Sequence, residues 1–522
     1  MSNHDTPFDF DKFRLRRFVE KLIDAGEVAI HEDPVSLADL SARVDETPKA
    51  SLFKQVGDEK FEMIAAVSGS RKRLAMAFGV DESKVIDEYT RRMANPQKVV
   101  EVSSASAPVH EVVITGDDID LMKLPFHLQH EYDGAPYISS GIDYSVDPAT
   151  GRTNVGCRRL MFRSRNTMRA NLSQPSDLKR VYLACVKRGE KLPASFAIGS
   201  HPLDYLAAGL RIPVDEFGLV GTLRGESVPM VRGLTNGVLA PADAEMIVEG
   251  YFDELGYREK EGPYGEFYGY YGPVHMDPVF HVTAITMRKD VLHQTVRHSG
   301  RYLSWTESAN LGGLNSELQM SRLLRAANIE PAAVCAVPGT NGRQSARVAL
   351  KRGTPGQARL AISALASIPR LKYIYIVDDD VNVFSNEEVE WAMSTRFRSD
   401  RDIVVLEGFA PFYMDPTTGD HGSIAKVGFD LTAPYGRPET VETRRAFAPR
   451  FADPSASTST KQFNNVREAL ASRPMFFMEL MSALGSTDGR EIALELDTLS
   501  QEGVLCRLSD GEWALEGSVD KK

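Results

Sequence analysis

At 522 residues the chain is too long for one hydrophobic core, so we expect several domains. Its formal net charge of −11 argues against a nucleic-acid or anionic-membrane partner, because both favour basic surfaces. The four cysteines stand far apart without a CxxC pair, which excludes a zinc knuckle and a disulfide framework. The first residues lack a signal peptide's apolar core and no apolar run approaches about eighteen residues, so we expect a soluble, cytoplasmic protein that acts on small molecules.

Residues 1–110 predict an N-terminal α/β domain. Apolar residues recur at helical spacing over 13–25, and a strand follows at 27–31. Further helices are expected at 35–45 and 70–78, and a strand at 99–102. This region shows a structural pattern and no motif that carries chemistry.

Residues 111–310 change to short β-rich runs between turn residues. We expect strands at residues 112–115, 137–144, 154–162, 194–198, 217–223 and 279–287. Many short strands with few long helices indicate a barrel or a sandwich.

The hexapeptide Glu261-Gly-Pro-Tyr-Gly-Glu266 lies inside this region and places two carboxylates on either side of a turn. On a helix or strand, Glu261 and Glu266 would diverge, whereas a turn can bring them together. Pro263 fixes its own φ, and Gly262 and Gly265 permit unusual backbone angles. Paired carboxylates in unequal environments serve acid/base chemistry, and a solvated surface turn is the alternative. The aromatic run that follows favours the wall of an apolar pocket: Phe267, Tyr268, Tyr270 and Tyr271.

Residues 311–448 predict a C-terminal α/β domain. A helix at 313–327 precedes buried strands at 332–337 and 373–377, with a helix at 354–368 between them. The second strand runs into Asp378-Asp-Asp380, at the end where parallel sheets often place a site or an interface. A solvated acidic strand end before a helix at 387–393 explains it equally well, so both interpretations stay open.

Residues 449–462 are rich in Pro, Ser and Thr and are interpreted as a linker. In residues 463–522, helices at 474–484 and 489–502 and a hairpin at 503–515 outline a winged-helix-like tail. The second helix is acidic, which argues against DNA binding. We expect a protein-interaction or lid role for the tail.

Four segments, in this order, resemble the UbiD family of decarboxylases that depend on prenylated flavin mononucleotide (prFMN): Asn154-xxxx-Arg159, Val214-Asp-Glu216, Gly225-Glu-Ser-Val-Pro229 and Glu261-Gly-Pro-Tyr-Gly-Glu266. Val377-Asp-Asp-Asp-Val381, Glu388-Val-Glu-Trp-Ala392 and Ala425-Lys426 extend the resemblance to about Pro434. Each motif is short, so the specificity lies in their number and order. The resemblance implies a multidomain α+β protein whose central domain is a split β-barrel that binds the flavin.

The resemblance implies that Asn154 and Glu216 ligate a divalent metal that holds the cofactor phosphate. Mn²⁺, or Mg²⁺, suits such oxygen ligands, and K⁺ is included as an additional ion. The family's third ligand is normally a histidine, which residues 173–177 lack, so Asp177 is the stand-in and water is the alternative. Lys426 matches a lysine that approaches the phosphate. The strand residues assigned with Asn154 to cofactor binding are Gly156, Cys157, Arg158 and Arg159.

The catalytic set implied by the resemblance is Arg159, Glu261 and Glu266. Arg159 keeps one glutamate ionised and orients the substrate carboxylate, and Glu266 delivers a proton after CO₂ leaves. No protein side chain can act as the electron sink, so the cofactor supplies it. Phe267 is expected to face the flavin. His293 and His298 fall where the family lines its substrate pocket, although each also fits a structural role.

The expected substrate is an aromatic, heteroaromatic or α,β-unsaturated carboxylic acid. A flavin prenyltransferase would supply the cofactor, and we expect a homodimer or higher homo-oligomer. One rival is a flavin or nicotinamide oxidoreductase, but no G-x-G-x-x-G follows a strand and the acid pair would lack a role. The other is a non-catalytic metal-binding scaffold or regulator. The state of the bound flavin separates these three hypotheses.

Overall fold

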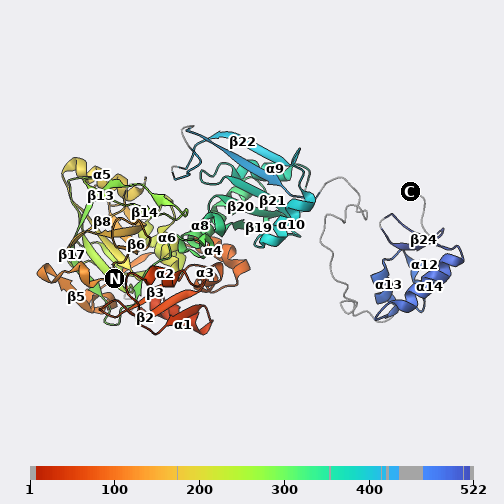
Figure 1. Ribbon diagram of the computed structural model, residues 1–522, viewed down its shortest axis with the longest axis horizontal. Helices are drawn as coiled ribbons and strands as arrows, with labels where there is room; N and C mark the ends of the chain where they lie inside the picture. The colour runs from red at the N-terminus through yellow and green to blue at the C-terminus, as the bar shows by residue number, and fades with distance from the viewer. Residues whose placement is uncertain are drawn as a thin grey trace, which may run out of the picture. The chain divides into compact units, whose positions relative to one another are not determined.

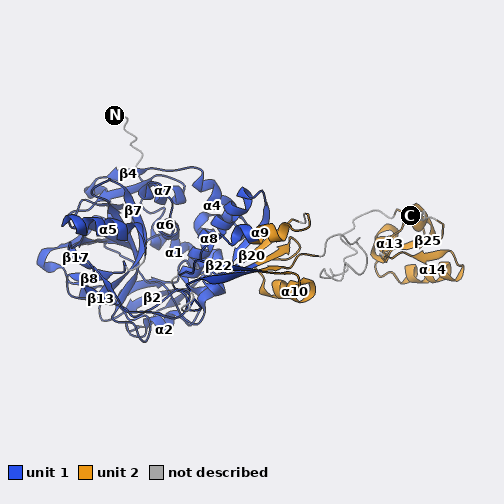
Figure 2. Ribbon diagram, turned by 90° about the horizontal axis from the view of Figure 1, so that it is seen from above, with its two compact units in different colours: residues 1–347, 363–374, 405–427 blue, residues 348–362, 375–404, 428–522 orange. Residues whose placement is uncertain are grey.

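The computed structural model describes residues 8–172, 175–351, 354–412, 414–418, 422–433, 462–509 and 511–517 (Figure 1). Two compact units divide the chain: residues 1–347, 363–374 and 405–427, and residues 348–362, 375–404 and 428–522 (Figure 2). No helix among the described residues is long and apolar enough to cross a membrane. The linker expected at 449–462 lies outside the described residues except for Gln462, and the boundaries at 110, 310 and 448 stay predictions.

A closed antiparallel barrel forms part of the first unit, because β12 pairs with β9 on one side and with β17 on the other. The order around the barrel is β12-β9-β6-β7-β8-β17, and β5 adds to β17. Closure leaves each barrel strand hydrogen-bonded on both sides. The barrel confirms the β-rich fold expected for the centre of the chain. The barrel strands are β6 (Tyr137–Val146), β7 (Thr153–Phe162), β8 (Thr167–Ala170), β9 (Leu192–Ile198), β12 (Met246–Phe252) and β17 (Val279–Met287), and the added strand is β5 (Val112–Thr115).

Apolar side chains pack against the barrel strands in two clusters. In one, the rings of Phe196, Phe252 and Phe280 lie 4.8–6.3 Å apart, beside helix α5 (Asp177–Arg188). In the other, Tyr144 and Val155 pack with helix α6 (Pro202–Ala208) and helix α7 (Glu216–Arg224). Burial of each large apolar side chain contributes about 1.5–3 kcal/mol, so these clusters fix the strands that carry the site.

The strand predicted at residues 217–223 was wrong, because this stretch forms α7. The carboxylate of Asp215 caps the helix by accepting from the Gly218 N–H at 3.1 Å, and Gly225 ends it with a φ of 82°. Every residue of α7 is buried, so its sequence lacks the one-sided apolar period that marks a surface helix. The helix places Glu216 in its first turn, where unpaired N–H groups favour a carboxylate.

The N-terminal part of the first unit combines short helices with a sheet of order β1-β2-β3-β18, in keeping with the expected α/β arrangement. The helix expected at residues 35–45 is shorter, because only Leu40–Val44 is helical. The elements are α1 (Leu15–Asp24), β1 (Val28–His31), α2 (Leu40–Val44), β2 (Ala50–Val56), β3 (Phe61–Ala65), α3 (Arg71–Phe78), α4 (Val85–Met93) and β18 (His293–Gln294). Smaller ladders are β4 (Val99–Val102) with β10 (Val228–Arg232) and β11 (Leu239–Pro241), β13 (Glu259–Glu261) with β16 (His275–Asp277), and β14 (Tyr264–Gly265) with β15 (Tyr271–Gly272).

Helix α8 (Glu307–Ala326) precedes a sheet of order β19-β20-β21-β23-β22. Its strands and helices are β19 (Pro331–Ala336), β20 (Ser345–Leu350), α9 (Gln357–Leu365), β21 (Tyr373–Asp378), α10 (Asn386–Arg396), β22 (Ile403–Phe409) and β23 (Ile424–Asp430). At the end of β21, Arg396 pairs with Asp380 at 2.5 Å and with Asp378 at 3.6 Å. The Ala433 N–H also donates to Asp378 at 2.7 Å. These contacts favour a structural role for the acidic strand end.

The tail contains the expected two helices and hairpin, with one further helix before them. Its elements are α12 (Val466–Ser472), α13 (Phe477–Leu484), α14 (Arg490–Gln501), β24 (Leu505–Arg507) and β25 (Trp513–Leu515). They share a core in which Leu470, Leu480 and Leu496 are buried.

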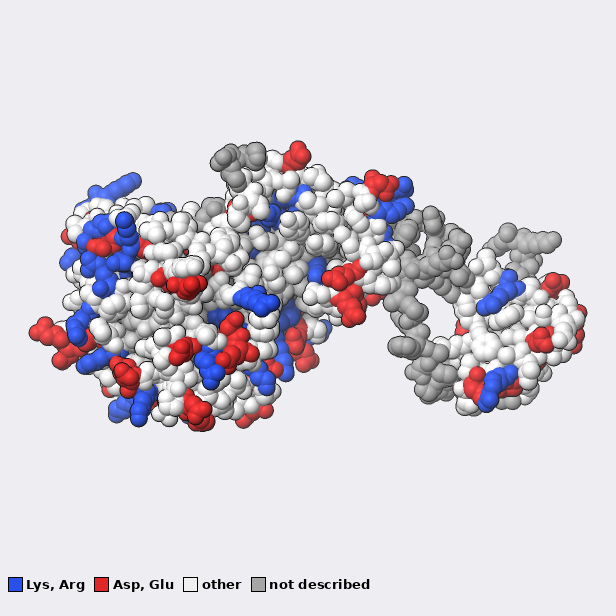
Figure 3. Space-filling view, viewed as in Figure 1, with Lys and Arg blue, Asp and Glu red and all other residues white. Residues whose placement is uncertain are grey.

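On the face drawn in Figure 3, acidic and basic side chains of the described residues are interspersed, so no single-sign patch dominates that face.

Candidate active site

Arg159, on β7, binds both glutamates of the Glu261–Glu266 turn. Its Nε and Nη2 donate to the two oxygens of Glu261 at 2.8 and 2.9 Å, and Nη1 donates to Glu266 at 2.6 Å. The guanidinium carbon also lies 4.4 Å from the ring centroid of Tyr264. The turn therefore brings the three residues predicted as the catalytic set into direct contact.

The turn between β13 and β14 depends on glycine at two positions. Gly262 has a φ of 83°, which residues with a side chain rarely adopt. Gly134 approaches it so closely that a Cβ at Gly134 would lie 2.2 Å from the Gly262 carbonyl oxygen. The Gly134 N–H also donates to the Pro263 carbonyl at 2.8 Å. These contacts hold the two glutamates in their convergent arrangement.

Glu261 is fully buried and has partners on both oxygens. The Tyr137 hydroxyl donates to it at 2.9 Å, and His275 Nε2 lies 3.0 Å from its other oxygen. Burial alone would raise the pKa of Glu261, but the His275 hydrogen bond and the Arg159 charge lower it well below its usual range. Glu261 is therefore an ionised charge partner of Arg159.

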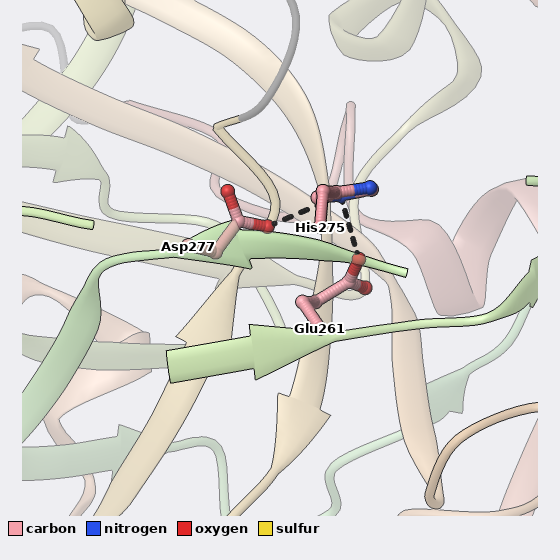
Figure 4. A group of neighbouring side chains, drawn as sticks. All are labelled: Glu261, His275 and Asp277. Carbon is pink, nitrogen blue, oxygen red and sulfur yellow. Dashed lines mark ion pairs between the residues drawn. The ribbon is translucent and has the colours of Figure 1, made fainter. Parts of the chain in front are cut away.

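His275 lies between two carboxylates (Figure 4). Its Nε2 is 3.0 Å from Glu261 and 3.5 Å from Asp277, and its Nδ1 is 2.9 Å from the Pro273 carbonyl oxygen. The carbonyl and the two carboxylates favour the doubly protonated ring, and the Asn171 amide nitrogen also lies 2.8 Å from Nε2. Hydrogen bonds to Asp277 and then to Glu261 raise the pKa of His275 to about 9.

The ligand atoms of Glu261, His275 and Asp277 lie within 4.8 Å of one another, so they could hold a metal ion. The adjacent Arg159 charge would repel a second cation, and the imidazolium already neutralises the carboxylates. Sequence reasoning missed His275 and Asp277. The feature that could have identified them is the pairing of β13 with β16, which sets Glu261 opposite His275 and Glu259 opposite Asp277.

Glu266 lies at the wall of a cavity of about 850 Å³, whereas Glu261 is not among the residues that line it. The Glu266 side chain is 10% exposed and has one hydrogen bond to Arg159, against two for Glu261. Phe267 and His298 line the same cavity. His293 does not, because it packs edge-on against Phe61 with ring centroids 4.9 Å apart. The two glutamates are therefore unequal, and Glu266 is the one that a ligand can reach.

The cavity also brings together the predicted metal ligands Asn154, Glu216 and Asp177. Asn154 donates to Asp143 at 2.5 Å, and Glu216 accepts from the Val155 N–H at 2.6 Å. Burial, followed by the negative charges of Asp177 and Asp143, raises the pKa of Glu216 to about 7.

This end of the cavity fits a divalent metal. Its donors are amide and carboxylate oxygens, and a bound cation would relieve the repulsion that Glu216 experiences. Asp177 is half-buried in the first turn of α5 and pairs with Arg180 at 3.1 Å. It is therefore less available as a metal ligand than Glu216.

The remaining predicted cofactor residues divide into two groups. Gly156, Cys157 and Arg158 line the cavity together with Arg159. Lys426 is not among the lining residues, because its ammonium donates to the carbonyl oxygens of Ala366, at 2.8 Å, and Ile368. Burial lowers the pKa of Lys426 to about 8.

Comparisons with known proteins identify the family of the chain. Residues 19–93, 100–301 and 309–431 match, in turn, the N-terminal, Rift-related and C-terminal domains of the 3-octaprenyl-4-hydroxybenzoate carboxy-lyase (UbiD) family. The anhydromevalonate phosphate decarboxylase of Methanosarcina mazei is 31% identical over 423 residues, which cover 80% of this chain and 95% of that protein.

Two solved enzymes share the fold. HmfF from Pelotomaculum thermopropionicum, in complex with FMN, is 30% identical with a TM-score of 0.78 and covers 85% of this chain and 98% of its own, and an evolved dimeric form was solved with prFMN. The 3,4-dihydroxybenzoic acid decarboxylase of Enterobacter cloacae is 26% identical with a TM-score of 0.76 and covers 85% of this chain and 99% of its own. The chain belongs to the UbiD family of decarboxylases.

Proposed function

We propose that the protein removes CO₂ from an α,β-unsaturated or aromatic carboxylic acid without net oxidation, with prFMN as its cofactor. The observation that carries the proposal is the unequal pair of glutamates on Arg159, with Glu266 at the cavity wall. When bound, prFMN supplies the electron sink that decarboxylation at an sp² carbon needs.

Arg159 has two roles in this proposal. It keeps Glu261 ionised, and its cavity-facing side orients the substrate carboxylate. Glu266 gives a proton to the carbon that has lost CO₂, and solvent restores that proton. Phe267, beside Glu266, limits water at the reacting carbon.

The metal and the cofactor phosphate are assigned to the end of the cavity that carries Asn154 and Glu216, with Asp177 or water as a further ligand. Mn²⁺ or Mg²⁺ suits these oxygens. Glu216→Gln and Asn154→Ala should each lower metal and flavin content in the purified protein, whereas His275→Gln should leave metal content unchanged. Full occupancy in both of the first two variants would remove this assignment.

The names of the relatives suggest two classes of substrate to test. One is named for an aliphatic phosphorylated acid and another for an aromatic acid. The test is co-expression with a flavin prenyltransferase, followed by CO₂ release from a panel that includes anhydromevalonate phosphate, its dephosphorylated acid and 3,4-dihydroxybenzoate. Release from none of a broad panel by protein loaded with prFMN would overturn the proposed function. Light scattering of the same sample would test the homodimer, which the dimeric relative supports.

A further inference from the structure

Arg343 and Arg370 are two of the five arginines outside the catalytic set that line the cavity. Arg343 Nη1 donates to the carbonyl oxygens of Ser308 and Asn341, at 2.9 and 3.0 Å. Arg370 lies over the ring of Phe412, 4.7 Å from its centroid. Within the part of the chain that the structure describes, neither arginine forms an ion pair with a carboxylate. They form a cationic pole without an internal counter-charge.

The pairing of these arginines is unfavourable by itself. Burial, and then the charge of Arg370, lower the pKa of Arg343 to about 10. Two cations placed together and partly removed from water destabilise the site unless an anion joins them. The mutual repulsion of the two arginines is relieved when an anion binds between them, which points to an anionic ligand.

The backbone is adapted to hold Arg343 in this position. A Cβ at Gly312, in α8, would lie 2.1 Å from the Arg343 guanidinium carbon, so only glycine leaves room for it. The preceding residues Asn341 and Gly342 have φ angles of 60° and 61°, and the turn packs tightly on α8. Left-handed backbone is unfavourable for a residue with a side chain, so the surroundings must hold Asn341 in it.

Aromatic rings separate this pole from Arg159. Arg159 lies over Tyr264, whose ring centroid is 5.3 Å from that of His298. His298 is 5.9 Å from Phe267, and Arg343 lies 5.1 Å from the Phe267 centroid. Burial, followed by the Arg159 charge, lowers the pKa of His298 to about 3, so the ring between the poles is neutral.

Tyr268 adds a donor near Arg343 and Arg370. Its hydroxyl is buried and has no hydrogen-bond partner among the residues described. Burial raises its pKa to about 12, while the charges of the two arginines act in the opposite direction. The hydroxyl is therefore protonated at neutral pH, but Tyr268 is not among the residues that line the cavity, so the ligand contacts are assigned to the two arginines.

We propose that Arg343 and Arg370 bind a phosphate monoester at the end of the substrate opposite the carboxylate that Arg159 orients. Two guanidinium groups supply enough donors for three phosphate oxygens, and their charge matches a dianion. The apolar section between the poles suits the carbon chain that joins the two anionic ends. This inference rests on the proposed decarboxylase function and identifies its substrate class.

The cofactor also carries a phosphate monoester, so flavin content must be measured beside activity. If the arginines bind the substrate, Arg343→Met and Arg370→Gln load flavin as the wild type does. Loss of flavin in these variants would assign the pole to the cofactor and overturn the proposal.

The activity test compares anhydromevalonate phosphate with its dephosphorylated acid. Loss of one charge-assisted contact should raise KM for the phosphorylated acid about 10- to 100-fold, with kcat and the dephosphorylated acid little changed. Arg343→Lys should raise KM less than Arg343→Met does, because lysine keeps the positive charge but lacks the paired N–H donors of a guanidinium group. Gly312→Ala should act like Arg343→Met by displacing the guanidinium. Gly313→Ala is the matched control, since its Cβ would meet nothing closer than 3.7 Å.

Two results would overturn the phosphate site without overturning the proposed decarboxylase function. A wild-type enzyme that decarboxylates both acids with equal KM, or only acids without a second anion, overturns the phosphate site and leaves the decarboxylase standing. Equal KM shifts for both acids in the arginine variants would also overturn it, because they would indicate a general structural role.

Discussion

Two buried arginines in this protein have nearly the same surroundings. Arg159 binds Glu261 and Glu266 and lies over Tyr264, while Arg224 binds Asp204 and Asp243 and lies over Phe13. In the second cluster the three side chains are each 2% exposed and none lines the cavity, whereas Arg159 and Glu266 are each 10% exposed and both line it.

The comparison separates a structural cluster from a reactive one. In the described chain, Asp204 and Asp243 have no ion pair except with Arg224. Glu261 has His275 and Tyr137 as well as Arg159. The fold can therefore survive the loss of Arg159 better than the loss of Arg224. The residue types of a cluster do not by themselves identify it as catalytic. The Arg159 cluster differs from the Arg224 cluster because a ligand can reach it and because its buried carboxylate has partners besides the arginine.

The largest expected effect is that of Arg159→Met on turnover. The change removes the anchor for the substrate carboxylate and alters both glutamates, so kcat/KM should fall by more than about 10⁴-fold. The protein should still fold, since Glu261 keeps its other partners. CO₂ release and circular dichroism on the same sample check both parts. Activity within tenfold of wild type would contradict the role of Arg159.

Arg224→Met should instead act on stability. It leaves two buried carboxylates without a cation, which costs about 3–5 kcal/mol. Urea denaturation measures the loss. Combining the change with Asp204→Leu and Asp243→Leu should recover much of it, because apolar replacement removes the unpaired charges. An Arg224→Met protein as stable as the wild type would contradict the structural role of the Arg224 cluster.

Glu266→Gln tests the reactive cluster more finely. Glutamine keeps the volume but cannot donate a carboxylic proton, so turnover should drop by about 10²–10⁴-fold with flavin content unchanged. Exchange of the product C–H in D₂O should vanish as well. Glu261→Gln is the matched variant, and wild-type exchange in Glu266→Gln together with none in Glu261→Gln would reverse the two roles.

His275→Gln tests the extra support of Glu261. The pKa of His275 is raised from 6.5 to about 9 in the folded protein, so its stabilisation is complete below about pH 6.5 and is lost as the pH rises through 9. The difference in unfolding free energy between wild type and variant should thus shrink with rising pH, from at most about 3 kcal/mol. Urea titrations at several pH values measure this difference in unfolding free energy. A difference that does not change with pH would show that His275 is not protonated in the folded protein.

The smallest effect is expected from truncation after Gln462. The tail has a core of its own, and neither arginine cluster includes a tail residue. Flavin content and the stability of both clusters should stay as in the full chain. A truncated protein without cofactor would show that the tail belongs to the folded core.

Part of this arrangement could be predicted from the sequence. The turn at 261–266 was identifiable because proline fixes the local backbone and glycine permits unusual angles, and the short strands predicted a barrel or a sandwich, of which the family resemblance favoured the barrel. Helix α7 was missed because burial on all sides removes the helical period. His275 and Arg343 were missed because the first depends on strand register and the second on a turn that packs against a glycine in another helix. Such relations are set by tertiary packing and leave little local signal.

Strand β7 also fixes a length. It carries Asn154 near its start and Arg159 five positions later, which spans about 16 Å at the usual rise of a strand. Strand β6 pairs with this strand from Thr153 to Arg158, and β8 pairs with it from Leu160 to Phe162, so neighbouring strands hold the backbone on both sides of Arg159. A one-residue insertion between the two would lengthen the span by about 3 Å and turn one end to the opposite face. The size of ligand that can reach both ends at once is therefore determined by a single segment of backbone.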